Sequence, residues 1–361
     1  MGVELANWTV ETFLETKFEG GRHETRVNKI SDLEEWCTLK IVYDPRHVFH
    51  VPKSQFINSK IESHMDTPQR IEETVKILKT KYSDCFIKSG DFPRSYLYMA
   101  HESDYIYWLK NKCKSLPNGE EYFPEIFGYD RIYDNKTPLM YNSFEIAWIS
   151  VKNALTGAQQ ILKNFEDTVY VLTRPAGHHA GFSSSGGYCY LNNAAIATKY
   201  IQSKTGGFIA VLDLDFFHGN GTQEIFYSDN SVLFISIHGN PINNYPYNTG
   251  YEWEIGDGVG KGYNINFPLE NSIDGRIYLR VLEKSLLEIE DFAPEQLIIS
   301  FGSNIHREDP NGKFNLSLND FKEIGRMIGE LNVSKLILQE GGTSGKLNAD
   351  SIEKFLEGLI N

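Results

Sequence analysis

Short apolar runs alternate with longer amphipathic stretches along most of the chain. Runs such as Ile209–Leu214 and Gln296–Phe301 are mostly apolar, as expected of strands that are buried on both faces. Between such runs lie segments in which apolar residues recur every three or four positions, which indicates helices. Strands that alternate with helices predict a mainly parallel central sheet with helices on both faces, and therefore an α/β fold.

The same pattern sets the expected element boundaries. Strands are predicted at 39–43, 169–172, 209–214, 232–237, 296–301 and 334–338. Helices are predicted after Thr67-Pro68 and at 102–112, 143–162, 191–202, 276–289, 321–331 and 349–359. Residues 47–66 and 117–141 are predicted to be irregular, and Gly219–Gly221 is predicted to be a turn. Because no repeat or linker is visible, we predict an N-terminal extension at 1–37 and a single domain over 38–361.

Composition excludes several classes of protein. The net charge of -13 over 361 residues argues against a nucleic-acid binder, which needs basic groups for phosphate contacts. No apolar run approaches the roughly 20 residues of a membrane span, and the N-terminus lacks the apolar core of a signal peptide. We therefore predict a cytoplasmic protein with no nucleic-acid and no membrane partner.

Chemically active residues cluster directly after four predicted strands. The clusters are RPAGHHAG at 174–181, VLDLDFFHGNGT at 211–222, ISFGSNIHREDP at 299–310 and LILQEGGTSG at 336–345. In an open α/β sheet, ligands bind outside the carboxyl ends of the strands. The four clusters are therefore predicted to converge on one pocket.

Several long motifs in this order resemble the histone deacetylase superfamily, and within it the bacterial acetylpolyamine amidohydrolases. They are RPAGHHAG, GGYCYLNNAA, VLDLDFFHGNGTQEIFY and FISIHGNP. The resemblance covers about residue 39 to the end, and it implies the arginase-deacetylase α/β fold. It also implies zinc-dependent removal of acetyl groups from amines, in which the metal activates water and polarises the amide carbonyl.

The resemblance carries over only part of the family's site. His178 and His179 match the tandem pair that moves protons. Asp213 matches the carboxylate that orients the first His of that pair, and Asp215 matches the first zinc ligand. Cys189 matches a packing position in the family, which favours packing over a nucleophilic role.

Three positions depart from the family pattern. Phe217 stands where the His ligand of zinc is expected, Asn304 where the Asp ligand is expected, and Thr343 where the oxyanion-stabilising Tyr is expected. Phe cannot bind a metal, and the amide oxygen that Asn304 could offer is a poor substitute for a carboxylate on zinc. Asp215 is then the sole retained ligand position, so we expect no zinc and no zinc-dependent hydrolysis.

Three functions stay open at this point. The first is a protein that binds a small amine or amide ligand, or a partner, in the inherited pocket. The second is a metal-independent enzyme that uses His178, His179 and Asp213 for acid–base chemistry. The third is a surviving metal-dependent deacetylase of acetylated polyamines or lysines, whose shifted site would recruit residues near the old one: His218, His306 and Asp309.

The resemblance also suggests the surroundings of the site. Tyr188 and Tyr245 would flank the tunnel, with Gly187 beside Tyr188. A structural K+ would be held by Asp213, Asp215 and Ser236. The stretch 117–141 looks like the loop insertion through which acetylpolyamine amidohydrolases form a dimer, so a homodimer is predicted.

Overall fold

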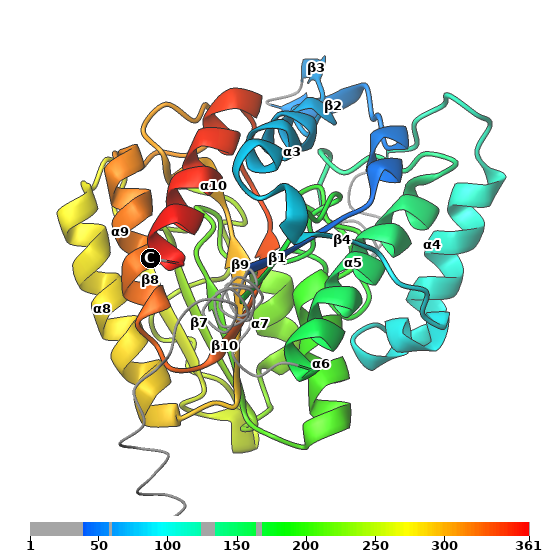
Figure 1. The fold of residues 1–361 in the computed structure, drawn as a ribbon. Helices are drawn as coiled ribbons and strands as arrows, with labels where there is room; N and C mark the ends of the chain where they lie inside the picture. Colours follow the sequence, from blue (N-terminus) through cyan, green and yellow to red (C-terminus); the bar gives the residue numbers. More distant parts are fainter. Residues whose placement is uncertain (1–38, 58–59, 124–133, 164–167, 361) are drawn as a thin grey trace, which may run out of the picture. The chain divides into compact units, whose positions relative to one another are not determined.

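A parallel sheet of eight strands lies at the centre of the described chain (Figure 1). The structure is a computed structural model that describes residues 39–57, 60–123, 134–163 and 168–360. Contacts divide the chain into Met1–Thr38 and Leu39–Asn361, and all described elements belong to the second unit. The predicted extension at 1–37 lies outside the described residues.

All neighbouring strands of this sheet run parallel. Their order across the sheet is β4-β1-β5-β10-β9-β6-β7-β8. Their bounds are β1 Leu39–Tyr43, β4 Phe86–Lys88, β5 Thr168–Val171, β6 Ile209–Asp213, β7 Val232–Gly239, β8 Asn264–Leu269, β9 Gln296–Phe301 and β10 Ser334–Gln339. Every residue of β6, β7, β9 and β10 is buried, which explains their nearly continuous apolar runs.

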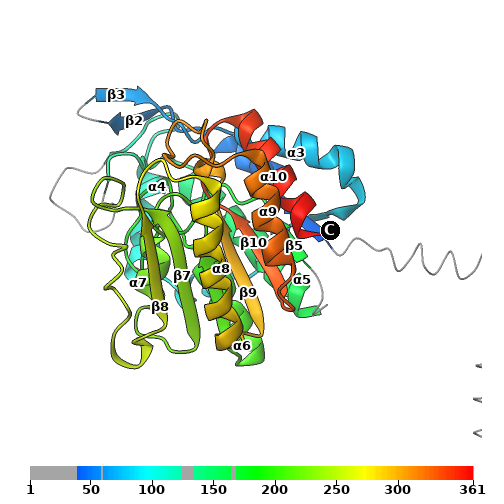
Figure 2. The same cartoon turned by 90° about the vertical axis from the view of Figure 1, so that its left-hand side faces the viewer.

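Helices cover both faces of the sheet (Figure 2). The helices α8 (Gly275–Phe292), α9 (Leu318–Gly329), α10 (Gly345–Leu359) and α3 (Gln69–Lys81) pack side by side on one face. The helices α4 (Ser103–Ser115), α5 (Ser143–Lys163), α6 (Asn193–Thr205) and α7 (Asn220–Phe226) lie on the other. The predicted α/β architecture is therefore confirmed. No described helix is both long and apolar enough to cross a membrane.

The predicted helices are found close to their expected bounds, and local chemistry explains where they begin and end. Asn192 caps α6, because its side chain accepts a hydrogen bond from the amide of Ala195. Gly206 ends α6 in the left-handed region with φ 70°, which glycine adopts without strain. A capping box of Ser317 and Asp320 starts α9.

Two of the sequence predictions were wrong. Residues 47–66 are not a plain loop, since β2 (Ser54–Ile57) and β3 (Lys60–Ser63) form an antiparallel pair. These strands are largely polar and β3 is fully exposed, so they carry no apolar signal. Gly219–Gly221 is not only a turn, because α7 begins at Asn220.

Further elements were not predicted. Strand β4 has three residues, too few for a periodic pattern, and β8 is only partly buried. Of the predicted insertion at 117–141, the structure describes 117–123 and 134–141. The proposed dimer contact through it therefore remains a prediction.

Four adjacent strands position the site. In the sheet order, β5, β10, β9 and β6 are neighbours. The four sequence clusters follow these strands at their carboxyl ends, so one edge of the sheet gathers them, as the topology of open α/β sheets requires.

Candidate functional site

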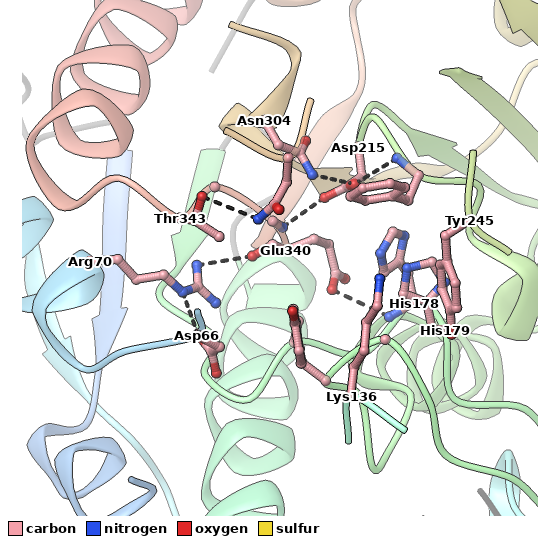
Figure 3. Close-up of a pocket in the computed structure, with 17 residues that line it drawn as sticks. Asp66, Arg70, Lys136, His178, His179, Asp215, Tyr245, Asn304, Glu340 and Thr343 are labelled. Atoms are coloured by element: carbon pink, nitrogen blue, oxygen red, sulfur yellow. Dashed lines mark hydrogen bonds and ion pairs between the residues drawn. The ribbon is translucent and has the colours of Figure 1, made fainter. Parts of the chain in front are cut away.

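One pocket lies beyond the carboxyl ends of these four strands (Figure 3). It encloses about 660 Å³, including its open mouth. Most of the residues predicted for the site line it, from His178 and His179 on one side to Asn304 and Thr343 on the other. The full lining is Asp66, Arg70, Lys136, Ala176, His178, His179, Gly187, Tyr188, Asp215, Phe217, Tyr245, Asn304, Asn311, Glu340, Gly341, Gly342 and Thr343.

His178 is held against a buried carboxylate. Its Nδ1 lies 2.9 Å from Oδ2 of Asp213, and both side chains are almost fully buried. Burial alone would lower the pKa of His178, but the negative charges of Asp213, Asp215 and Glu340 outweigh it and raise the pKa to about 10. His178 is therefore an imidazolium at neutral pH and can act as a proton donor.

His179 is the electrostatic opposite of His178. Its Nδ1 lies 2.7 Å from Oδ1 of Asn220. Since an amide oxygen only accepts, Nδ1 carries the hydrogen in this arrangement. Burial, the charge of His178 and, to a smaller extent, the charge of Lys136 lower the pKa of His179 well below its usual value. The tandem pair thus combines a charged ring and a neutral ring, whose centroids are 4.0 Å apart.

The first turn of α7 supports this pair. The amides of Gly221 and Thr222 donate to the carbonyl of His178 over 3.0 and 3.1 Å. A Cβ at Gly221 would lie 2.3 Å from the carbonyl oxygen of Ala180, so only glycine lets the helix approach the His loop this closely.

Asp215 is surrounded by hydrogen-bond donors. Its Oδ1 accepts from Nδ2 of Asn304 at 2.7 Å and from the amide of Phe217 at 2.9 Å. Its Oδ2 accepts from the amide of Gly341 at 2.7 Å. The carboxylate therefore has three N–H partners within the protein.

The orientation of Asn304 follows from both of its contacts. Its Oδ1 accepts from the amide of Phe216 at 3.0 Å, while Nδ2 faces Asp215. A flipped amide would set N–H against N–H at Phe216 and oxygen against carboxylate at Asp215. In this structure the amide oxygen of Asn304 therefore accepts from the backbone, and it is Nδ2 that faces Asp215.

Thr343 is also tied into a network. Its amide donates to Oδ2 of Asp309 at 3.0 Å, and its hydroxyl lies 3.2 Å from the same oxygen. Nδ2 of Asn311 donates to the Thr343 hydroxyl at 3.3 Å. The hydroxyl thus donates its hydrogen to Asp309, so in this conformation it has no hydrogen left to donate to an oxyanion.

Comparisons with known proteins agree with this arrangement of motifs. The model of the histone deacetylase domain matches residues 64–359. This chain belongs to the histone deacetylase family. It is 31% identical over 341 residues to acetylpolyamine amidohydrolase 1 of Pseudomonas aeruginosa, covering 88% of this chain and 98% of that one.

Two other similar proteins are also acetylpolyamine hydrolases by name. Acetylpolyamine amidohydrolase of Mycoplana ramosa is 30% identical over 323 residues, which covers 84% of this chain and 94% of that protein. The crystal structure of acetylpolyamine aminohydrolase from Burkholderia pseudomallei superposes with a TM-score of 0.84 at 30% identity, over 89% of this chain and 98% of that chain. The resemblance and the fold predicted from the sequence are thus confirmed.

The family implies zinc, but the residues at the inherited position do not fit it. Phe217 has no ligand atom, Asn304 presents an N–H to Asp215, and both Asp215 oxygens accept N–H groups. Zinc needs lone pairs from at least three protein ligands in family-type catalytic sites. The metal-binding set that the family implies is therefore reduced to one carboxylate.

Two of the three residues considered for a shifted metal site, His306 and Asp309, accept hydrogen bonds from the backbone. Nδ1 of His306 accepts from the amide of Glu308, and Oδ1 of Asp309 accepts from the amide of Asn311. Among the described residues, the one group of three metal-ligating side chains with atoms within 4.8 Å of one another is His178, Cys189 and Glu340. It includes none of the residues proposed for the shifted site.

Two further predicted residues lie behind the pocket. Ser236 pairs with Asp213 in the sheet register, but its hydroxyl bonds Nδ1 of His238 at 2.8 Å, so a role in holding K+ remains a prediction. Cys189 is buried, and burial raises its thiol pKa well above the usual value. A thiol that stays protonated is a poor nucleophile, which agrees with a packing role.

The mouth of the pocket is formed by Gly187, Tyr188, Tyr245 and neighbouring residues. A Cβ at Gly187, where φ is 54°, would lie 2.1 Å from the ring of His179. Tyr188 donates to Oε1 of Gln55 in the unpredicted hairpin at 2.6 Å. The hydroxyl of Tyr245 donates to Asp134 at 2.8 Å. The two predicted aromatic walls are therefore fixed at their polar ends.

Sequence reasoning missed several lining residues. Arg70 donates from Nε to Oδ1 of Asp66 at 2.7 Å and from Nη1 to the carbonyl of Glu340 at 3.0 Å. Glu340 is buried, and burial, partly offset by His178, raises its pKa to about 7. Glu340 follows a buried strand, so the strand-end rule could have found it. Arg70 and Lys136 reach the pocket from distant segments without such a signal.

Proposed function

We propose that this chain is a histone deacetylase family protein that has lost zinc-dependent hydrolysis and binds a small amine- or amide-type ligand in the inherited pocket. The observation that carries the proposal is the hydrogen bond from Nδ2 of Asn304 to Asp215. It puts a donor where the family has a metal-ligating carboxylate. Loss of zinc removes the activated water and the polarised carbonyl together.

The pocket itself supports the binding half of the proposal. Phe217, Tyr188 and Tyr245 supply apolar walls, which suit a methylene chain. Polar groups of His178, His179 and Glu340 lie at the inner end, where an amide can find both donors and acceptors. A concave, mostly apolar cavity with a few convergent polar groups is typical of a small-molecule site.

The first test is metal content. The purified protein is soaked in excess zinc, desalted and analysed for bound metal, next to the Phe217→His/Asn304→Asp variant. We expect less than stoichiometric zinc in the wild type. Zinc near one per chain in the wild type, with release of acetate from acetylated polyamines or acetyl-lysine peptides, would support the surviving-deacetylase alternative and overturn the proposal.

A second candidate function has its own supporting observation. The paired rings differ in charge, because Asp213 holds His178 protonated while burial and the charge of His178 lower the pKa of His179 and keep it neutral. One ring could donate a proton and the other accept one, which is the requirement of metal-independent acid–base chemistry. This reading predicts an activity that chelators do not affect and that both His178→Gln and His179→Gln abolish. An activity that either variant retains would exclude it.

A further inference from the structure

We propose that the ligand of this pocket carries a carboxylate, which Lys136 and Arg70 recognise, and belongs to the acylamido acids rather than the acetylated polyamines. This inference rests on the proposed function, because it names the chemistry of the ligand for the same site. It starts from Lys136, which lines both the inner pocket and the adjoining outer cavity.

The backbone of Lys136 is held by two hydrogen bonds, whereas its ammonium has no acidic partner among the described residues. Its amide donates to Oδ1 of Asp134 at 2.9 Å, and its carbonyl accepts from Nε2 of His64 at 3.1 Å. Its ammonium lies 5.6 Å from the centroid of the Tyr245 ring, within the range of a cation–π contact. No carboxylate among the described residues pairs with this ammonium. In Figure 3 the side chain reaches towards the two His rings.

Arg70 approaches the cavity from the other side (Figure 3). Its Nε and Nη1 are used by Asp66 and by the carbonyl of Glu340. Within the described part of the chain, Nη2 has no hydrogen-bond partner, and Arg70 lines the cavity. A guanidinium that is fixed by two bonds and has a third donor group open is preorganised to bind an anion.

The carboxylates around the pocket, in contrast, are already used as acceptors. Asp66 accepts on Oδ1 from Arg70 and from Nε of Arg174, while its Oδ2 has no hydrogen-bond partner among the described residues. Asp215 accepts three N–H groups, as described above. Glu340 accepts from two amides and from a Ser hydroxyl.

Both oxygens of the carboxylate at the mouth, that of Asp134, also accept hydrogen bonds. Asp134 accepts from the Lys136 amide and the Thr137 hydroxyl on Oδ1, each at 2.9 Å. On Oδ2 it accepts from the Gly187 amide and the Tyr245 hydroxyl. A cationic ligand would find an open carboxylate oxygen only at Oδ2 of Asp66, whose charge is already paired with Arg70 and Arg174, and it would face the ammonium of Lys136. An anionic ligand finds two unused donors.

Aromatic walls between the mouth and the inner end favour a ligand with an apolar chain and an amide. A phosphate group would demand more donors than these two side chains supply. A carboxylate on a short methylene chain matches both the donors and the walls, so the probes are three acetamides of similar length. They are acetamidocaproate, which ends in a carboxylate, the neutral N-pentylacetamide, and N-acetylcadaverine, which ends in an ammonium.

Binding of the three probes is measured by calorimetry on the full chain and on two variants. Lys136→Met keeps the stem of the side chain and removes the charge. Lys79→Met is the matched control, because the Lys79 ammonium also lies 5.6 Å from an aromatic ring, that of Phe86, outside the pocket. We expect acetamidocaproate to bind at least about tenfold more tightly than N-acetylcadaverine.

The variants separate recognition of charge from recognition of shape. Lys136→Met should weaken acetamidocaproate about five- to tenfold, leave N-pentylacetamide unchanged and improve N-acetylcadaverine. Lys79→Met should change none of the three. Equal or tighter binding of N-acetylcadaverine by the wild type, an unchanged ranking in Lys136→Met, or no binding of any probe at millimolar concentration would overturn the inference. Acetate release from a probe in the presence of zinc would overturn the proposed function alone, since the ranking of the probes can still be read from the rates.

Discussion

Replacing Asn304 by Asp tests the loss of the metal site directly. Asn304 and Asp215 are 2% and 1% exposed, and their side chains are joined by a hydrogen bond of 2.7 Å. Asn304→Asp restores the carboxylate that the family expects at this position. Without a metal, it also places two buried carboxylates within hydrogen-bonding distance, and such a pair cannot ionise fully.

The cost of this change follows from the bond that is lost and from the proton that must be taken up. A hydrogen bond to a charged group contributes about 1.5–3 kcal/mol. A shared proton recovers part of it, but it raises the pKa of the pair in the folded state. Each unit by which the folded pKa exceeds the unfolded value of about 3.9 costs about 1.4 kcal/mol once the pH lies above both. A rise of about two units therefore removes about 2.7 kcal/mol at neutral pH.

The sign of the effect makes it easy to recognise. Because the folded pKa is raised, the variant should match the wild type in acid and lose stability as the pH rises through the folded pKa. Urea unfolding of the wild type and Asn304→Asp between pH of about 4 and 8 measures this. Asn230→Asp, at an exposed position, is the matched control and should show no such slope.

Zinc should reverse the penalty when Phe217→His supplies a third ligand, beside Asp215 and the carboxylate introduced by Asn304→Asp. In Phe217→His/Asn304→Asp, zinc at a hundredfold excess over its dissociation constant adds about 2.7 kcal/mol to the free energy of unfolding. The wild type should gain nothing from the same zinc. A stability of Asn304→Asp that does not depend on pH relative to wild type, or a wild type that zinc stabilises as much as the double variant, would refute the reasoning.

Two further predictions concern buried ionisable groups. Asp66→Asn should destabilise the protein by about 3–5 kcal/mol in urea unfolding, because it leaves the guanidiniums of Arg70 and Arg174 buried without their shared carboxylate; a loss below about 1 kcal/mol would contradict this. His101 accepts from the amide of Asn192 at 2.9 Å, and burial lowers its pKa to about 4. The stability that the neutral His101 ring contributes is complete above the unfolded pKa of about 6.5 and is lost as the pH falls towards about 4. His101→Gln should therefore flatten the fall of the unfolding free energy in this range by up to about 1.4 kcal/mol per pH unit. An unchanged slope of the unfolding free energy against pH would speak against a buried neutral ring.

The fold was predictable where burial of a strand or helix requires a regular pattern of apolar residues. Strands β6, β9 and β10 are apolar because helices cover both of their faces, and this signal does not depend on distant partners. The hairpin of β2 and β3 was missed because its four-residue strands are mostly polar. Strand β8 has intermediate burial at four of its six positions, so its residues do not form a continuous apolar run.

The site was predictable where residues follow strands of the sheet. His178, Asp215, Asn304 and Thr343 were found together because each follows the carboxyl end of a strand. Lys136 lies in a segment without a regular element, and its place in the pocket depends on contacts with Asp134 and with the hairpin side of the chain. No local pattern encodes such contacts, so the charge of the pocket could not be read from the sequence.

What replaced the missing zinc ligands depends on side-chain direction, which the sequence does not contain. Asn304 and Thr343 are polar and could each have faced the cavity with an open oxygen. Instead Asn304 bridges Phe216 and Asp215, and Thr343 bonds Asp309. The two networks share no hydrogen bond, so the polar groups of Asn304 and of Thr343 find their partners independently of each other. A site that had merely lost its metal would keep unpaired acceptors around Asp215, and its carboxylate would then be an unstable buried charge. The three N–H donors on Asp215 remove that instability without a metal, which supports the proposal that the pocket works without zinc and that the open donor groups of Lys136 and Arg70 bind its ligand.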